Sequence, residues 1–274
     1  MKKNMLASAL LLALPLAAFA DAPPPPPEGW SGTGEAGLAI ASGNTKSENL
    51  NAKLDVKYND DTWKDDFYLL AQRNKSNVTT TTIDSSTTPP TLVSTSQYNL
   101  TASRYETGAS AGYKFDDRSY IVGALRYEHD EFSPYDYQYV ASIGYGYQFL
   151  KNASDELSAE AGPGYKVAQP TSIVAEAGNP PVLVKIQPDS DKDAVLRGKI
   201  DYRHNFNSAT SFIDSFVVEA GSSNNFFQND AGVQVKMSDK LALKAAYQVR
   251  YNSDVLPGFK KTDNLFTTNL VYGF

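Results

Sequence analysis

Only two histidines are present in the chain, and one of them has partners for hydrolytic chemistry close by in the sequence. His129 lies in the stretch RYEHDEFS, beside Asp130 and Glu131 and four residues before Ser133. A serine, a histidine and a carboxylate can form a nucleophile with its base when they converge in space. Sequence neighbours do not establish that geometry, and neither histidine has a serine two positions later, the spacing of familiar lipid hydrolases. A hydrolase with its site near His129 is therefore the weakest functional hypothesis, and we assign no catalytic residue.

A second candidate site is the acidic run PDSDKDA, in which Asp189, Asp191 and Asp193 occupy alternate positions. Carboxylates at positions 1, 3 and 5 begin a calcium loop, but the glycine at position 6 and the distal glutamate are missing. We interpret the run as a solvated loop tip, with divalent-ion bridging to lipid phosphates as the alternative. The absence of cysteine excludes thiolate metal sites and a disulfide scaffold. We expect no cofactor.

The largest set of chemically useful side chains recurs at every second position of segments that alternate between polar and apolar residues. This alternation is the period of a β-strand, on which successive side chains point to opposite faces. In YDYQYVASIGYGYQF, for example, Tyr137, Tyr139 and Ile143 share one face, and Gln138 and Gln148 share the other. Twelve such segments are predicted, at about 30–42, 46–58, 62–75, 95–115, 119–130, 136–149, 155–168, 193–206, 210–222, 226–237, 240–252 and 262–274.

The polar faces of these segments carry nine basic and six acidic residues. They are Lys53, Asp55, Lys57, Arg126, Glu128, Glu160, Arg197, Lys199, Asp201, Arg203, Glu219, Asp230, Lys236, Lys244 and Arg250. If the segments form a closed barrel that spans a membrane, these side chains line the lumen and the apolar faces contact lipid. The local basic excess would then favour small anions if the lumen conducts. In the fourth segment the apolar phase slips near Arg104, which indicates a β-bulge or a strand that runs beyond the bilayer.

The connections between the segments favour such a barrel over a soluble β-sandwich. Those after the second, fourth, sixth, eighth and tenth segments are tight, and the long ones, including the flexible loop expected from Thr79 to Ser96, lie at the opposite end. Even strand number with this sorting of connections is the layout of outer-membrane barrels. We therefore predict an all-β fold, a closed up-and-down antiparallel transmembrane β-barrel over residues 30–274, with both termini periplasmic.

Aromatic residues on the apolar faces gather near both ends of the predicted strands. Those beside the tight turns are Tyr58, Tyr113, Tyr147, Phe149 and Phe206, and those toward the loops are Tyr127, Tyr137, Tyr139 and Tyr251. This is the arrangement of aromatic belts at the two membrane interfaces. The chain also ends on Leu270, Tyr272 and Phe274. That pattern resembles the assembly signal of outer-membrane barrels and predicts recognition by the barrel-assembly machinery.

The first twenty residues predict export. Lys2 and Lys3, the apolar run MLASALLLALPLAAF and the small residues around position 20 have the layout of a secretory signal peptide over residues 1–20. Residues 21–29 form a Pro-rich N-terminal segment. Loss of the signal changes the net charge from −6 to −8, which argues against a nucleic-acid partner. We expect a monomer in contact with the outer-membrane lipids of a Gram-negative bacterium.

Several stretches resemble the family of salt-induced outer membrane proteins, whose common domain has no known function. The likeness runs in order through GWSGTGEAGLAIASGNTKSENL, LRYEHDEFSPYDYQYVASIGYGY, LSAEAGPGY and TDNLFTTNLVYGF, over nearly all of the exported chain. It implies an outer-membrane barrel and transfers no substrate or catalytic residue. The family name supplies the leading hypothesis, a structural barrel that supports the envelope under osmotic stress. Twelve strands lie between a filled barrel and an open channel, so a narrow polar pore and a specific small-solute channel stay open as alternatives.

Overall fold

Twelve β-strands form a closed antiparallel barrel in the computed structural model, which describes residues 28–41, 46–133, 135–170, 172–176, 182–186, 189–255 and 260–274. The barrel strands are β1 (Gly29–Ala41), β2 (Ser47–Asn59), β3 (Trp63–Asp84), β4 (Thr91–Lys114), β5 (Ser119–Asp130), β6 (Tyr135–Lys151), β7 (Asp155–Pro170), β10 (Asp191–Asn205), β11 (Thr210–Gly221), β12 (Phe226–Lys236), β13 (Leu241–Asn252) and β14 (Thr262–Gly273). Two further strands, β8 (Ser172–Glu176) and β9 (Val182–Ile186), pair with each other. The predicted signal peptide and residues 21–27 lie outside the described residues.

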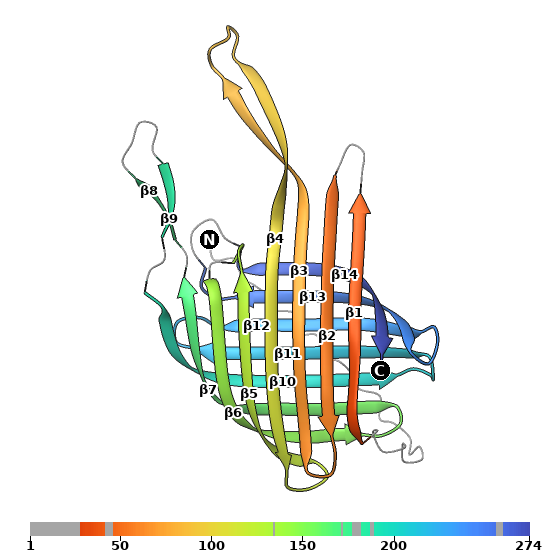
Figure 1. The fold of residues 1–274 in the computed structure, drawn as a ribbon. Helices are drawn as coiled ribbons and strands as arrows, with labels where there is room; N and C mark the ends of the chain where they lie inside the picture. Colours follow the sequence, from red (N-terminus) through yellow and green to blue (C-terminus); the bar gives the residue numbers. More distant parts are fainter. Residues whose placement is uncertain are drawn as a thin grey trace, which may run out of the picture.

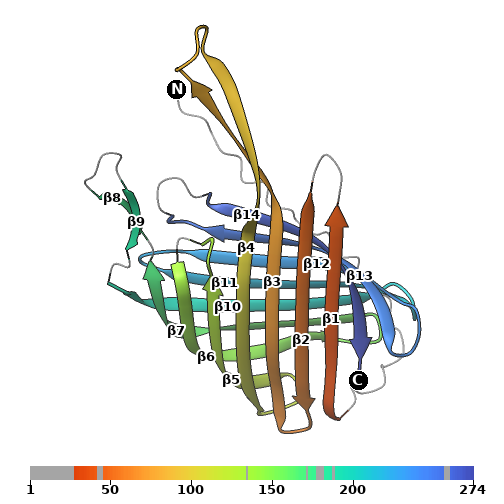
Figure 2. The ribbon, with the colours of Figure 1, turned by 45° about the horizontal axis from the view of Figure 1, so that its top comes forward.

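Neighbouring barrel strands are also neighbours in the chain, apart from the closing pair β1–β14 and the pair β7–β10, between which β8 and β9 are inserted. Figure 1 shows that β1 to β7 cross β10 to β14 on the opposite wall, and Figure 2 shows the same arrangement from a turned view. Opposite walls of a barrel cross in this way because every strand tilts relative to the barrel axis. The predicted closed twelve-strand barrel is thus confirmed. No helix able to span a membrane is found among the described residues.

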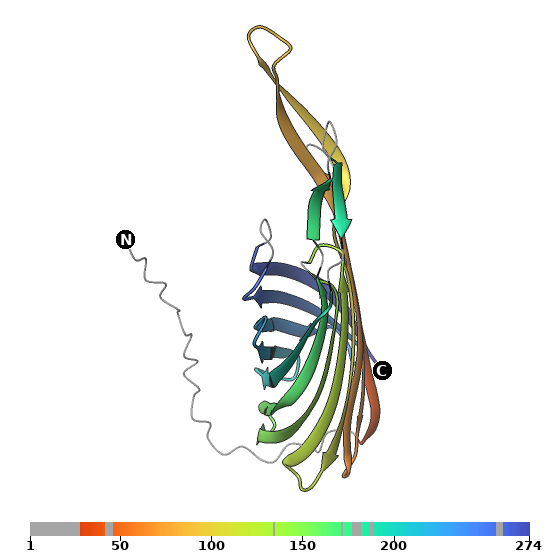
Figure 3. The ribbon, with the colours of Figure 1, turned by 90° about the vertical axis from the view of Figure 1, so that its left-hand side faces the viewer.

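Two hairpins project from the end of the barrel that carries the long connections, called the loop side below. Strands β3 and β4 continue beyond the wall and pair with each other as far as Asp84 and Thr91. Most of the predicted loop over 79–96 is therefore strand, and it stands away from the barrel (Figure 3). The smaller hairpin, β8–β9, was not expected from the alternation.

The predicted irregularity in the fourth segment is a register shift three residues before Arg104. Asn74 faces Ala102, but its neighbour Lys75 faces Leu100, so Thr101 is left over as a bulge residue. A bulge of this kind exchanges the two faces of a strand beyond it. The side chains on either side of Thr101 therefore follow different alternation phases, which explains the slip in the apolar pattern.

The tight turns at the opposite end, called the turn side, share one hydrogen-bond motif. In four of them an acidic or amide side chain accepts hydrogen bonds from the backbone N–H groups two and three residues later; these residues are Asp60, Asp116, Asn152 and Asn207. Asp and Asn favour turns for this reason. The backbone N–H groups of Trp63 and Thr62 lower the pKa of the Asp60 carboxyl, and those of the corresponding turn residues lower the pKa of the Asp116 carboxyl.

The barrel closes where the last residues of β14 meet the first half of β1. Four residue pairs join the two strands, and Phe274 exchanges two backbone hydrogen bonds with Gly32, at 2.9 and 3.0 Å. The ring of Phe274 lies against Gly32, where an added Cβ would come within 2.4 Å of the ring. The side chains of Leu270, Tyr272 and Phe274 are 45–59% exposed. The C-terminal aromatic residue is thus part of the closing seam on the turn side.

The outer face of the barrel is apolar between two rows of aromatic rings. Its middle carries side chains that are 44–64% exposed, among them Leu38, Leu69, Leu125, Ile143, Leu196 and Leu243. On the loop side, Tyr127 packs between Tyr105 and Tyr139, with ring centroids 6.1 and 5.2 Å away. On the turn side, the ring of Tyr147 lies 5.0 Å from that of Phe149. The nine predicted belt residues lie on this face, near the strand ends expected from the sequence.

Candidate functional site in the barrel lumen

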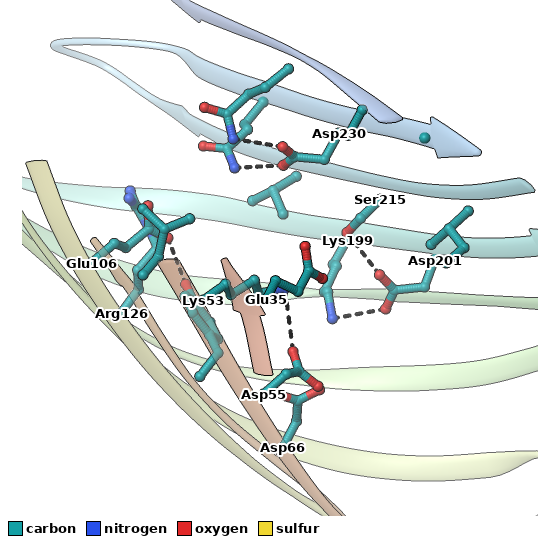
Figure 4. A pocket seen from close by; sticks show the side chains of 18 of the residues that line it. Glu35, Lys53, Asp55, Asp66, Glu106, Arg126, Lys199, Asp201, Ser215 and Asp230 are labelled. Carbon is teal, nitrogen blue, oxygen red and sulfur yellow. Dashed lines mark hydrogen bonds and ion pairs between the residues drawn. The ribbon is translucent and has the colours of Figure 1, made fainter. Parts of the chain in front are cut away.

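A cavity of about 290 Å³ occupies the barrel lumen, and charged side chains from both walls contribute to its lining. Lys53 and Asp55 approach it from β2, whereas Lys199 and Asp201 approach from β10 and Asp230 from β12 (Figure 4). These side chains meet because alternate residues of every barrel strand face the interior. The cavity is therefore a direct product of the period-two pattern.

The charges that line the cavity are balanced. The acids are Glu35, Asp55, Asp66, Glu106, Glu160, Asp201 and Asp230, and the bases are Lys53, Lys57, Arg104, Arg126, Arg197, Lys199 and Lys244. The basic excess expected from the sequence is therefore absent from the cavity wall. The correction arises because three acids and one base outside the predicted set, Glu35, Asp66, Glu106 and Arg104, line the cavity, whereas three predicted bases and two predicted acids do not.

In the turn-side half of the lumen, ion pairs run along the walls and the side chains meet water. Lys199 Nζ lies 2.8 Å from Asp201 Oδ2 on the same strand, and the Asp201 side chain is 42% exposed. The Lys57 side chain, which is 55% exposed, pairs with acids on its own strand and on neighbouring β3. Lys244 reaches Glu35 at 2.9 Å across the intervening strand β14. Such pairs leave the centre of this half open to solvent.

In the loop-side half, buried side chains fill the interior, and they include seven charged side chains and one phenylalanine ring that are each no more than 9% exposed. These eight are Arg104, Glu106, Arg126, Glu128, Lys166, Glu219, Phe226 and Arg250, and they are called the central cluster below. They come from β4, β5 and β7 on one wall and from β11, β12 and β13 on the other. The central cluster therefore spans the lumen.

The strongest contacts of the central cluster join opposite walls. The Arg126 guanidinium donates two hydrogen bonds to the Glu219 carboxylate, at 3.0 and 2.9 Å. Arg250 Nη2 donates to both oxygens of Glu128 at 2.6 Å, and Arg126 Nη1 donates to Glu128 at 2.8 Å. Strands β5 and β13, which supply Glu128 and Arg250, lie six places apart in the closed order of twelve strands. This pairing therefore crosses the full width of the barrel.

Phe226 is the apolar centre around which the cations of the cluster gather. Its side chain is among the most completely buried in the described chain. The Arg126 and Arg250 guanidinium carbons lie 4.9 and 5.3 Å from the ring centroid, and Lys166 Nζ lies 5.6 Å from it. Contacts of this geometry are attractive, and they gain strength when water is excluded. Phe226 thus fills the space between cations that are also paired with carboxylates.

Hydrogen bonds continue from the central cluster into the cavity wall. Arg104 Nη2 donates to Gln248 Oε1 at 3.1 Å, and Gln248 Nε2 donates to Asp230 at 2.5 Å. On the other wall, the Tyr68 hydroxyl donates to Glu106 at 2.6 Å. Since Arg104 and Glu106 also line the cavity, the central cluster bounds the cavity on the loop side. Buried side chains thus fill the loop-side half of the lumen, and the cavity lies toward the turn side.

Of the charged residues predicted to face the lumen, ten line the cavity: Lys53, Asp55, Lys57, Arg126, Glu160, Arg197, Lys199, Asp201, Asp230 and Lys244. Glu128, Glu219 and Arg250 belong to the central cluster. Arg203 and Lys236 occupy the same alternation close to the turn side, outside the cavity lining. Sequence reasoning missed Glu35, Asp66, Arg104, Glu106, Lys166 and Phe226, although Lys166 shares the even-numbered phase of Glu160.

The residues around His129 do not assemble a hydrolytic triad. His129 Nδ1 lies 4.0 Å from Asp136, and the imidazole stacks on the ring of Tyr105 with centroids 4.8 Å apart. The Ser133 hydroxyl instead accepts a hydrogen bond from the backbone N–H of Tyr135 at 3.2 Å. The neighbours in sequence are thus engaged elsewhere.

The acidic run at the start of β10 lies along an extended strand, and its carboxylates are not gathered around one point. In the part of the chain that the structure describes, no group of three or more His, Cys, Asp or Glu side chains could hold an ion. Asp193 instead accepts hydrogen bonds from the Ser222 hydroxyl and from the backbone N–H and hydroxyl of Ser223, at 2.8–2.9 Å. Asp191 begins the strand, and alternate residues of an extended strand are about 7 Å apart. An extended backbone does not wrap its carboxylates around an ion as a calcium loop does.

A closed β-barrel with an apolar outer face and a charged, partly filled lumen is the class of protein that these features define. Residues 34–274 match the model of a family described as protein of unknown function, DUF481, and the chain belongs to that family. The resemblance to a family without an assigned function is thereby confirmed, whereas the salt-induced name is not.

Among known proteins, the chain is similar to the uncharacterized protein YdiY of Escherichia coli (strain K12). The two are 23% identical over 234 residues, which is 85% of this chain and 79% of that protein. Similar solved structures include the translocator domain of the autotransporter NalP from Neisseria meningitidis, with 10% identity and a TM-score of 0.45 over 89% of this chain and 86% of that one. The NanC porin has 12% identity and a TM-score of 0.42 over 89% of this chain and 97% of that one.

Proposed function

We propose that this protein is an outer-membrane barrel with a structural role in the envelope, and that the central cluster keeps its lumen closed to solutes. The apolar outer face and its aromatic rows support the membrane placement. Tyr139 and Tyr147 are eight residues apart on β6, which is about 27 Å along a strand and about 20 Å along the axis of a barrel tilted by about 45°. This height is close to the apolar band of about 25 Å in outer-membrane barrels.

The cross-wall pairing of Arg250 with Glu128 is the observation that carries the closed-lumen proposal. A conducting pore needs a continuous aqueous path, but these side chains meet across the full width of the barrel at 2.6 Å. Arg126 and Glu219 add a second bridge. Removing one partner of such a buried pair leaves an uncompensated charge, so the closed arrangement resists opening.

The remaining parts of the proposal concern the setting of the barrel. We place the turn side and both termini in the periplasm, because short turns of outer-membrane barrels face that compartment. The exported chain would insert through the barrel-assembly machinery with Phe274 as part of its signal, contact outer-membrane lipids and act as a monomer within the bilayer. Support under osmotic stress follows from the family resemblance alone.

A small-solute channel is the second candidate function, and the solvated turn-side cavity favours it. In this alternative the central cluster is a gate rather than a permanent closure. Because the cavity is lined by equal numbers of acids and bases, we expect little selection between small anions and cations. The anion preference inferred from the sequence is therefore not carried into this proposal.

Fractionation and transport assays test the proposal in two stages. We expect the protein in the urea-washed outer-membrane fraction, with a heat-dependent shift on a denaturing gel, and a deletion strain that grows poorly at high salt. In proteoliposomes, arabinose, glutamate and lysine should enter no faster than into empty vesicles. Rapid entry of all three would replace the structural role with the channel, whereas recovery in the periplasmic soluble fraction would overturn the membrane placement.

A further inference from the structure

The part of the β3–β4 hairpin beyond the barrel wall has two free strand edges. Within the described residues, pairing of β3 with β2 ends at Ser76, and pairing of β4 with β5 begins only at Arg104. The segments Val78–Asp84 and Thr91–Gln97 pair with each other alone and are called the ribbon below. Each outer edge therefore presents backbone N–H and C=O groups that lack a neighbouring strand.

On the β3 edge of the ribbon, Val78–Ile83 has none of the features that normally protect a free edge. Charged side chains, proline, bulges and very short edge strands prevent edge-to-edge pairing in natural sheets. The segment Val78–Ile83 reads VTTTTI, six β-branched residues without charge, proline or glycine. Such a segment has the composition of chains that pair readily as strands. At its end, Ile83 faces Leu92 across the ribbon, and the two side chains are 67% and 73% exposed.

A second copy of this chain is the partner that fits this edge. The rest of the exported chain is acidic, so copies repel one another at most of their surface, but Val78–Ile83 adds no charge to that repulsion. An exposed edge is recognised by an added strand through main-chain hydrogen bonds. The β3 edges of two copies carry the same alternating backbone donors and acceptors. They can therefore pair with each other in an interface with two-fold symmetry, in which both copies use the same surface.

We propose that two copies of the protein associate through antiparallel pairing of their β3 edges. In an antiparallel pair, residues lie directly opposite each other, so two identical strands can be related by a two-fold axis and keep all their hydrogen bonds. In a parallel pair the hydrogen bonds are slanted, and the two strands are not equivalent. Two barrels inserted in one membrane hold their ribbons in the same direction, so antiparallel pairing requires barrels in two membranes that face each other. This inference rests on the proposed membrane placement.

The ribbon is positioned for such a contact. It stands away from the barrel wall on the loop side (Figure 3), so a partner strand can approach it without meeting the barrel. The Thr81 and Ser94 hydroxyls lie 2.9 Å apart across the ribbon, which ties its two strands together. The monomer expected from the sequence then describes the barrel within its own membrane, and the ribbon makes the contact between membranes.

Single-cysteine variants test the pairing directly, because the chain contains no cysteine. Two-fold antiparallel pairing centred on Val78–Ile83 places either Thr80 or Thr81 opposite itself, with Cβ atoms about 5 Å apart and close to disulfide geometry. Mild oxidation of the folded barrel in detergent should give a disulfide dimer from Thr80→Cys or from Thr81→Cys. Thr95→Cys is the matched control, since Thr95 faces Thr80 within the ribbon but lies on β4.

A vesicle assay then tests whether the pairing joins membranes. Proteoliposomes of the wild-type protein should aggregate, and the double variant Thr80→Lys with Thr82→Lys should lose this aggregation because like charges oppose each other across the edge. Thr95→Lys with Gln97→Lys adds the same charge on β4 and should retain it. A folded barrel that gives no dimer from either β3 variant, or equal dimer from Thr95→Cys, overturns the inference. Failure of the folded barrel to enter vesicles would instead contradict the proposed placement, and the detergent experiment would still decide the pairing.

Discussion

The two halves of the lumen are built from the same residue types but hold their charges in different ways. On the turn side, Lys199 and Asp201 pair along one strand and remain partly exposed to water. On the loop side, Arg126 and Glu219 pair between walls, with side chains 9% and 0% exposed. A pair of the first kind contributes little to stability because water screens it. A pair of the second kind is costly to break because either partner would be left buried and uncompensated.

This difference shows that inward faces of similar composition can be either solvated or tightly filled. Acids and bases on the inward faces are consistent with a wet channel when they pair along a wall, and with a closure when they pair across the barrel. Phe226 adds an apolar side chain at the centre of the loop-side half, where three cations approach its ring. We infer that the loop-side half closes the barrel and the turn-side half is a solvated recess.

The largest difference between the halves should appear on removal of one carboxylate from each. Glu219→Ala leaves Arg126 and Lys166 without their shared partner and should reduce the free energy of unfolding by about 3–5 kcal/mol. Asp201→Ala is the matched control and should cost no more than about 1 kcal/mol, since its ion pair is solvated. Urea unfolding in detergent, followed by the heat-dependent gel shift, measures both. Equal losses for the two variants would show that the halves do not differ as described.

Truncation of the apolar centre should open the closure with a somewhat smaller loss of stability. Phe226→Ala removes the ring between the cluster cations and should cost about 3 kcal/mol, while ion conductance increases. Phe227→Ala is the control, because the next residue on the strand faces outward and packs against Tyr251 and Phe216. If both variants conduct alike, the closure does not depend on the central cluster.

On the turn side, insertion of the barrel should depend more on the pairing of β1 with β14 than on the charged side chains of the lumen. Phe274→Ala is expected to reduce the yield of inserted barrel, because the ring packs against Gly32 beside the paired ends of β1 and β14. Phe266→Ala, on the same strand and 68% exposed, should insert normally. Pulse-labelling with the heat-dependent gel shift measures insertion, and normal assembly of both variants would remove the terminal residue from the signal.

The smallest expected effect is in the tight turns. The lowered pKa of Asp60 means that its turn is stabilised above the ordinary carboxyl pKa of about 4 and loses this contribution as pH falls through the lowered value. Asp60→Ala should therefore be slightly less stable than the wild type at pH 7 and should match it at strongly acidic pH. Asp60→Asn keeps an acceptor at every pH. A difference for Asp60→Ala that grows on acidification would contradict the proposed role of the carboxylate.

The fold could be predicted well because its information is local. Alternation along each segment places Lys53, Asp55 and Asp201 on one face without knowledge of any partner strand. Sorting of tight and long connections indicates up-and-down order, and the terminal aromatic residues indicate where the sheet closes. The ribbon was missed as a strand because Ser and Thr runs are also typical of loops, and here they pair across a hairpin without a buried face.

The central cluster could not be predicted because its contacts are between distant strands. Arg126 and Glu219 are 93 positions apart, and their meeting depends on the tilt and closure of the whole barrel. Arg104 and Glu106 were missed for a different reason, since the bulge at Thr101 changes the phase in which they should be counted. Inward faces are thus readable from sequence, but the division of a lumen into open and closed halves is a property of the closed sheet.

Planar-bilayer recording of the wild-type barrel beside Phe226→Ala tests the closed loop-side half most directly. At low salt, the wild-type protein should stay at the baseline, and Phe226→Ala should give discrete openings with little preference for anions over cations. A steady ohmic conductance of the wild-type barrel, equal to that of the variant, would contradict the closure.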